Sequence, residues 1–95
     1  MLVSATVRVR FDKAEASPER ARVEQAARLL EQLGFEILRI GRFGVNVRAQ
    51  DSTFHRILGV KPAPNQALAA PVSSTNPALR ELVDLVEVAP KPQLY

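Results

Sequence analysis

The residues with the most reactive side chains gather near the middle of the chain, where His55 follows Asp51 and Ser52. Serine, histidine and aspartate are the types that hydrolytic triads use. A triad is defined by geometry, however, and side chains one turn apart on a helix do not form its chain of hydrogen bonds. His55 is the only histidine and cysteine is absent, so no group of residues has the spacing of a metal site. We therefore expect no enzyme activity, no metal and no cofactor.

The glycine-flanked segment 41–44, Gly-Arg-Phe-Gly, is a second candidate binding element. A phosphate-binding loop precedes the N-terminus of a helix. This segment instead joins two stretches with strand character, which is typical of a hairpin turn. The preferred interpretation is therefore a turn and not an anion site.

Charge and hydropathy exclude several classes of partner. Thirteen basic and ten acidic residues give a net charge of +3, and the basic residues are spread along the chain, which favours a solvated surface over a nucleic-acid footprint. No apolar run approaches the roughly 18 residues that a membrane-spanning helix needs. No apolar segment typical of a signal peptide follows Met1. The sequence thus predicts no nucleic acid, no membrane contact, and a cytoplasmic protein if Met1 is the true start.

The first elements are marked by clear periodicity. Residues 3–11 alternate between apolar and polar, which predicts a half-buried strand. Ser17 suits a helix N-cap and Pro18 suits the first helical position. Apolar residues then recur at helical spacing until Gly34, a candidate C-cap. We therefore predict a strand followed by one long helix.

A hairpin and a second helix follow. Residues 36–40 and 45–49 predict two strands joined by the short glycine-containing turn. Asp51 or Ser52 is expected to cap a short helix whose apolar face includes a phenylalanine and which closes at Gly59.

The last third of the chain is rich in proline. Residues 61–77 contain four prolines and predict an extended surface loop. A short helical turn is expected over 76–82 and a last strand over 86–88. Pro90 and Pro92 prevent continued pairing inside a sheet, so the final residues should leave it as a tail.

The element order is strand, helix, strand, strand, helix, strand. With right-handed crossovers it predicts an α+β ferredoxin-like fold, the split βαβ sandwich, with a four-stranded antiparallel sheet and two helices on one face. The chain divides into a domain over 1–89 and an extended tail over 90–95. RNA-binding domains share this order but stack bases on aromatic residues of the open sheet face. The outward positions here hold no aromatic residue: Thr6, Arg8, Arg10, Asn46 and Arg48.

Three stretches of the chain resemble the propeptide domains of subtilisin-like and sedolisin-like serine peptidases. They are Gly-Phe-Glu-Ile-Leu at 34–38, Phe-Gly-Val-Asn-Val-Arg-Ala at 43–49 and Phe-His-Arg-Ile-Leu-Gly-Val at 54–60. In those propeptides a helix ends at glycine, a hairpin follows, and a short helix carrying phenylalanine closes near a Gly-Val pair. Residues 77–84 are similar to the sedolisin version, and residues 83–88 with the tail are similar to the subtilisin version.

The resemblance implies an inhibitor, a folding chaperone, or both, for a subtilisin-like serine peptidase encoded in cis or in trans. Such domains lay the open sheet face on the peptidase and thread the tail through its active-site cleft as an extended strand. The implied docking residues on the sheet are Arg8, Arg10, Asn46, Arg48 and Glu87. The implied tail residues are Pro92, Gln93, Leu94 and Tyr95, with Tyr95 in the primary pocket.

A second function fits the same fold. A small ferredoxin-like regulatory or adaptor module would bind another protein or a small effector, and its proline-rich end would be an ordinary frayed terminus. In either case we expect a chain that is a monomer alone or a weak dimer, because an exposed edge strand permits association.

Overall fold

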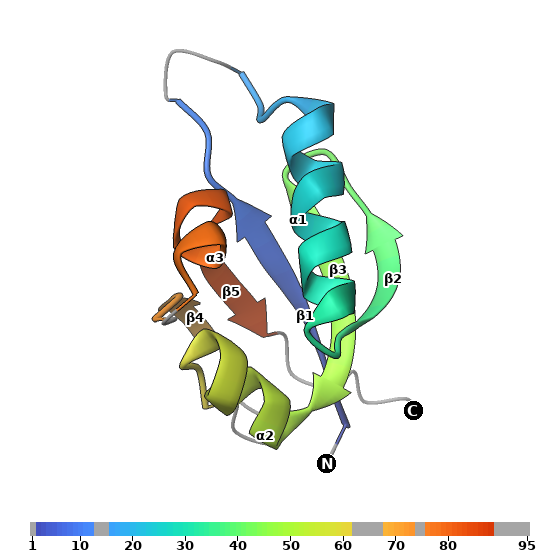
Figure 1. Cartoon of the computed structure of the whole chain (residues 1–95), viewed down its shortest axis with the longest axis vertical. Helices are drawn as coiled ribbons and strands as arrows, with labels where there is room; N and C mark the ends of the chain where they lie inside the picture. The colour runs from blue at the N-terminus through green and yellow to red at the C-terminus, as the bar shows by residue number, and fades with distance from the viewer. Residues whose placement is uncertain (1, 13–15, 62–67, 74–75, 89–95) are drawn as a thin grey trace, which may run out of the picture.

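The computed structural model of the chain describes residues 2–12, 16–61, 68–73 and 76–88, and Figure 1 shows how their elements are arranged. Within these residues the chain forms an α+β domain with an antiparallel sheet and helices packed against it. The elements are β1 (Leu2–Val9), α1 (Arg20–Gln32), β2 (Glu36–Ile40), β3 (Gly44–Gln50), α2 (Asp51–Thr53), η1 (Phe54–Leu58), β4 (Leu68–Pro71), α3 (Pro77–Leu82) and β5 (Val83–Val88).

The described strands form one five-stranded sheet in the order β2-β3-β1-β5-β4. Every neighbouring pair is antiparallel. The longest contact joins β1 to β3, with seven residue pairs running from Leu2–Gln50 to Arg8–Gly44. The strand order places β1 at the centre of the described sheet and β2 and β4 at its edges.

The core lies between one face of the sheet and the helices. Alternate residues of β1 and β3 are buried because successive side chains of a strand point to opposite faces. Helix α1, which crosses the sheet in Figure 1, buries one apolar stripe against them. The members of that stripe are Val23, Ala26, Ala27 and Leu30.

An aromatic pair anchors the second helical segment. Phe35 and Phe54 meet edge to face with ring centroids 5.1 Å apart, and both are almost completely buried. Helix α2 continues into one π-helical turn, η1, which ends at Gly59 in the left-handed conformation. The predicted closure at Gly59 is confirmed, whereas the N-cap is Gln50 and not Asp51 or Ser52.

Several predicted boundaries are wrong by a few residues. Strand β1 ends at Val9 and not at residue 11. Helix α1 begins at Arg20 with Glu19 as N-cap, so Ser17 does not cap it. The short helix α3 is confirmed, but β5 follows it at once from Val83, three residues earlier than predicted.

The largest departure concerns the proline-rich segment. Residues 61–77 were expected to be a loop, yet β4 lies inside them and pairs with β5 from Leu68–Val88 to Pro71–Leu85. Proline is tolerated here because β4 is an edge strand, where one side of the backbone needs no partner. The sheet therefore has five described strands and not the four expected from the sequence.

Candidate functional site

The sheet face opposite the helices carries most of the residues that the sequence singled out. Thr6 and Arg8 point there from β1, and Asn46 and Arg48 from β3, since their neighbours in each strand are buried. Glu87 joins them from β5, where it lies opposite Thr6. We call these residues, with Glu36 of β2, the open-face cluster.

The members of the open-face cluster contact one another across neighbouring strands. Arg48 forms an ion pair with Glu36 on β2, with 2.5 Å between Nη2 and Oε2. Thr6 Oγ1 donates to Asn46 Oδ1 at 2.8 Å, and Arg8 pairs with Glu87 on β5. Three side-chain contacts thus bridge β2 to β3, β3 to β1, and β1 to β5.

These pairs change the expected electrostatics of the face. Unpaired arginines at 8 and 48 would favour an acidic partner, but each already has a carboxylate against it. Their side chains stay about half exposed, 47% for Arg8 and 44% for Arg48. The face therefore presents fixed, alternating charges to a partner rather than one broad positive patch.

Arg10 does not belong to the open-face cluster, because β1 ends one residue before it. Its Nε donates to the carbonyl oxygens of Arg80 and Val83, at 3.1 and 3.2 Å. Its own carbonyl accepts from Arg22 at 3.1 Å. Arg10 thus ties the end of β1 to the junction of α3 and β5 and to α1.

Beside the charged cluster, the same face carries a strip of apolar side chains that the sequence did not predict. Leu85 lies opposite Arg8, and the pairing of β4 with β5 places Pro71 opposite Leu85 and Ala69 opposite Glu87. Directly opposite residues of antiparallel strands share one face. The open face is therefore polar over β1 and β3 and apolar toward β4.

The remaining predicted site residues fall elsewhere. The tail residues Pro92, Gln93, Leu94 and Tyr95 lie outside the described residues. His55 is exposed on η1. Over the described ranges, no polar or charged residue is buried, no group of three potential metal ligands occurs, and no helix is long and apolar enough to cross a membrane.

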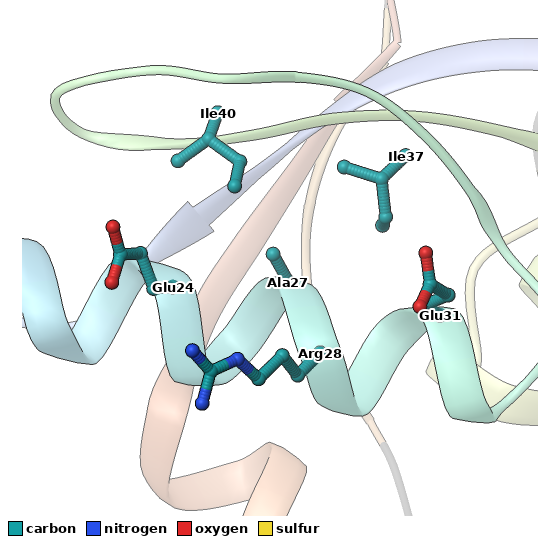
Figure 2. Close-up of a pocket in the computed structure, with 6 residues that line it drawn as sticks. All are labelled: Glu24, Ala27, Arg28, Glu31, Ile37 and Ile40. Atoms are coloured by element: carbon teal, nitrogen blue, oxygen red, sulfur yellow. The ribbon is translucent and has the colours of Figure 1, made fainter.

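A groove between α1 and the edge strand β2 is a second surface feature that sequence reasoning missed. It has a volume of about 300 Å³. Figure 2 shows Ile37 and Ile40 of β2 directed toward Ala27 of α1. Three charged helix residues complete its lining: Glu24, Arg28 and Glu31. The groove depends on the angle at which α1 packs beside β2, which the periodicity of either segment does not specify.

Comparison with known proteins gave no match to any family model, curated protein or solved structure.

Proposed function

We propose that this chain is a propeptide-like inhibitor, folding chaperone, or both, of a subtilisin-like serine peptidase. In this proposal the open-face cluster docks on the peptidase, and the tail over 90–95 enters the active-site cleft as an extended strand. The observation that supports it most is the continuity of β5 with that tail. Glu87 of β5 belongs to the open-face cluster, and the chain continues from Val88 directly into the tail residues.

The proposal includes a finer description of the fold. We infer that β1, α1, β2, β3, the segment α2–η1 and β5 form a ferredoxin-like unit, into which β4 and α3 are inserted before the last strand. The order β2-β3-β1-β5 supports this, because it is the strand order that two interleaved right-handed βαβ crossovers produce.

The composition of the open face supports protein docking. Protein interfaces combine an apolar centre with polar groups whose hydrogen bonds are satisfied. Here Leu85, Pro71 and Ala69 supply apolar surface next to the charged pairs. Because Glu36 and Glu87 already hold the arginines in place, docking would not have to order those long side chains anew.

An inhibition titration tests the proposal. The full chain is added to a subtilisin-like peptidase, and hydrolysis of a chromogenic peptide is followed. Two altered chains serve for comparison: one that lacks residues 92–95, and one in which the same four positions are replaced by Gly-Ser-Gly-Ser. We expect the full chain to inhibit and both altered chains to inhibit at least roughly tenfold more weakly. Equal inhibition by all three would contradict the tail mechanism.

The groove beside β2 favours a second candidate, a regulatory or adaptor module of the same fold. Its apolar floor and charged walls suit a small effector or an apolar side chain of another protein. If the full chain inhibits no subtilisin-like peptidase, this candidate replaces the first. A rise of the melting temperature in the presence of a bound partner would support it.

A further inference from the structure

The outer edge of β2 is a strand edge without the usual protection by proline. In the part of the chain that the structure describes, the sheet order leaves one side of β2 unpaired, whereas the opposite edge strand, β4, ends in Pro71. The pairing of β2 with β3 shifts register once, between Ile37 and Arg39, so an incoming strand would meet one irregular position. Two large apolar side chains of β2 are also exposed, Leu38 and Ile40, each at 47%. An edge of this kind is a template for pairing with another strand.

Charged residues of α1 run alongside this edge with alternating sign. They lie three or four positions apart, so they follow one side of the helix: Arg20, Glu24, Arg28 and Glu31. Arg20 pairs with Glu24 at 3.3 Å. Among the described residues, neither Arg28 nor Glu31 has an ion-pair partner, although both line the groove (Figure 2).

This row of charges is complementary to itself. In a dimer with two-fold symmetry, the two copies of α1 lie side by side and antiparallel. Each positive residue of one row then faces a negative residue of the other row. When the axis passes level with residue 26, Arg28 of one copy faces Glu24 of the other, and Arg20 lies near Glu31. The two positive and two negative charges of the row cancel, so the row does not favour a basic or an acidic peptide. A second copy of α1 in antiparallel orientation carries the complementary order of charges.

We propose that the chain associates with a second copy of itself through β2 and α1. The two β2 strands meet antiparallel, with Ile37, Leu38 and Ile40 in the contact. Arg28 of each copy pairs with Glu24 of its partner. The interface is one five-residue strand and one side of a helix, so we expect it to bury less than roughly 1,200 Å² and to be weak.

This association leaves the open-face cluster free. The side chains of the cluster lie on the sheet face opposite α1, whereas the contact uses the backbone edge of β2 and the helix layer. Glu36 is the one cluster residue that belongs to β2. A dimer would therefore present two open faces. The inference does not rest on the peptidase proposal, and either can fail without the other.

Sedimentation equilibrium of the full chain over a dilution series tests the association. We expect the average mass of the wild type to rise toward that of a dimer as the concentration approaches about 1 mM. Arg28→Glu and Glu24→Arg each place like charges opposite one another, so each variant alone should remain monomeric. An equimolar mixture of the two restores opposite charges and should associate again.

Two further variants make the result specific. Arg56→Glu on η1 changes the net charge as Arg28→Glu does but lies outside the groove, so it should associate like the wild type. Leu38→Lys changes only β2 and should abolish association, because it places a charged side chain in the contact between the two strands. The proposal would be overturned if the wild type stayed monomeric or if Arg28→Glu or Leu38→Lys still associated. It would also be overturned if the mixture of Arg28→Glu and Glu24→Arg stayed monomeric.

Discussion

Arg8 of β1 and Glu87 of β5 form an ion pair across the open face of the sheet, although 79 positions separate them in the sequence. The register sets this contact, because Glu87 lies opposite Thr6 and Arg8 is the next residue of β1 on the same face. The pair joins the centre of the sheet to the strand that leads into the tail. A substitution in this pair can therefore separate an effect on the free energy of unfolding from an effect on binding to the peptidase.

Replacement of Glu87 by glutamine should affect stability very little. Both side chains are more than 40% exposed, and exposed ion pairs contribute about 0–1 kcal/mol. We expect urea unfolding to show a loss of about 0.5 kcal/mol. Inhibition of the peptidase, in contrast, should weaken by roughly tenfold, because truncating one partner of a charge pair that becomes buried in a complex is costly.

Glu81→Gln on α3 is the matched control for this prediction. It removes the same charge from an exposed position outside the open-face cluster. It should leave both stability and inhibition close to wild type. Equal weakening of inhibition by the two variants would show that net charge, and not the position of Glu87, is responsible.

Replacement of Asn76 by alanine should destabilise the domain by about 1 kcal/mol. The Asn76 side chain caps α3, where Oδ1 accepts from the backbone N–H groups of Ala78 at 2.9 Å and Leu79 at 3.4 Å. Ser17→Ala is the informative comparison, because Ser17 was the predicted cap of α1 but lies outside that helix. It should change the free energy of unfolding by less than about 0.5 kcal/mol. A larger loss for Ser17→Ala than for Asn76→Ala would contradict the observed caps.

Gly59→Ala should be among the most damaging substitutions in the chain. Gly59 has φ of 68°, and an added Cβ would overlap the carbonyl oxygen of Ser73. Gly34→Ala provides the control, because Gly34 has φ of 110° but open space around the added atom. We expect Gly34→Ala to cost about 1 kcal/mol and Gly59→Ala clearly more. Equal urea midpoints for Gly34→Ala and Gly59→Ala would contradict this prediction. They would mean that the backbone around Ser73 moves aside without loss of stability.

The sequence was most informative where periodicity is strong. Strand β2 has the predicted bounds, α3 begins one residue later than predicted, and β1, α1 and β3 differ from prediction only at their ends. The missed strand β4 has the sequence Leu-Ala-Ala-Pro, which contains no β-branched residue. Its strand conformation depends on pairing with β5, and such tertiary contacts override local propensity at a sheet edge.

The candidate site was only partly predictable for a related reason. Alternation correctly placed Thr6, Arg8, Asn46 and Arg48 on one face. The partners Glu36 and Glu87 could be matched to the arginines only once the register between strands was known. The groove along β2 depends in the same way on how α1 lies against the sheet. Contacts between distant segments leave no local pattern in a single sequence.

The proposed docking of the open-face cluster on a subtilisin-like peptidase can be mapped directly by nuclear magnetic resonance. The amide spectrum of the ¹⁵N-labelled full chain is compared with and without the peptidase. We predict shifts or broadening at Thr6, Asn46 and Glu87, with Ala27 and Arg28 in the groove unchanged. Changes confined to the α1–β2 groove, or an unchanged spectrum, would contradict the account.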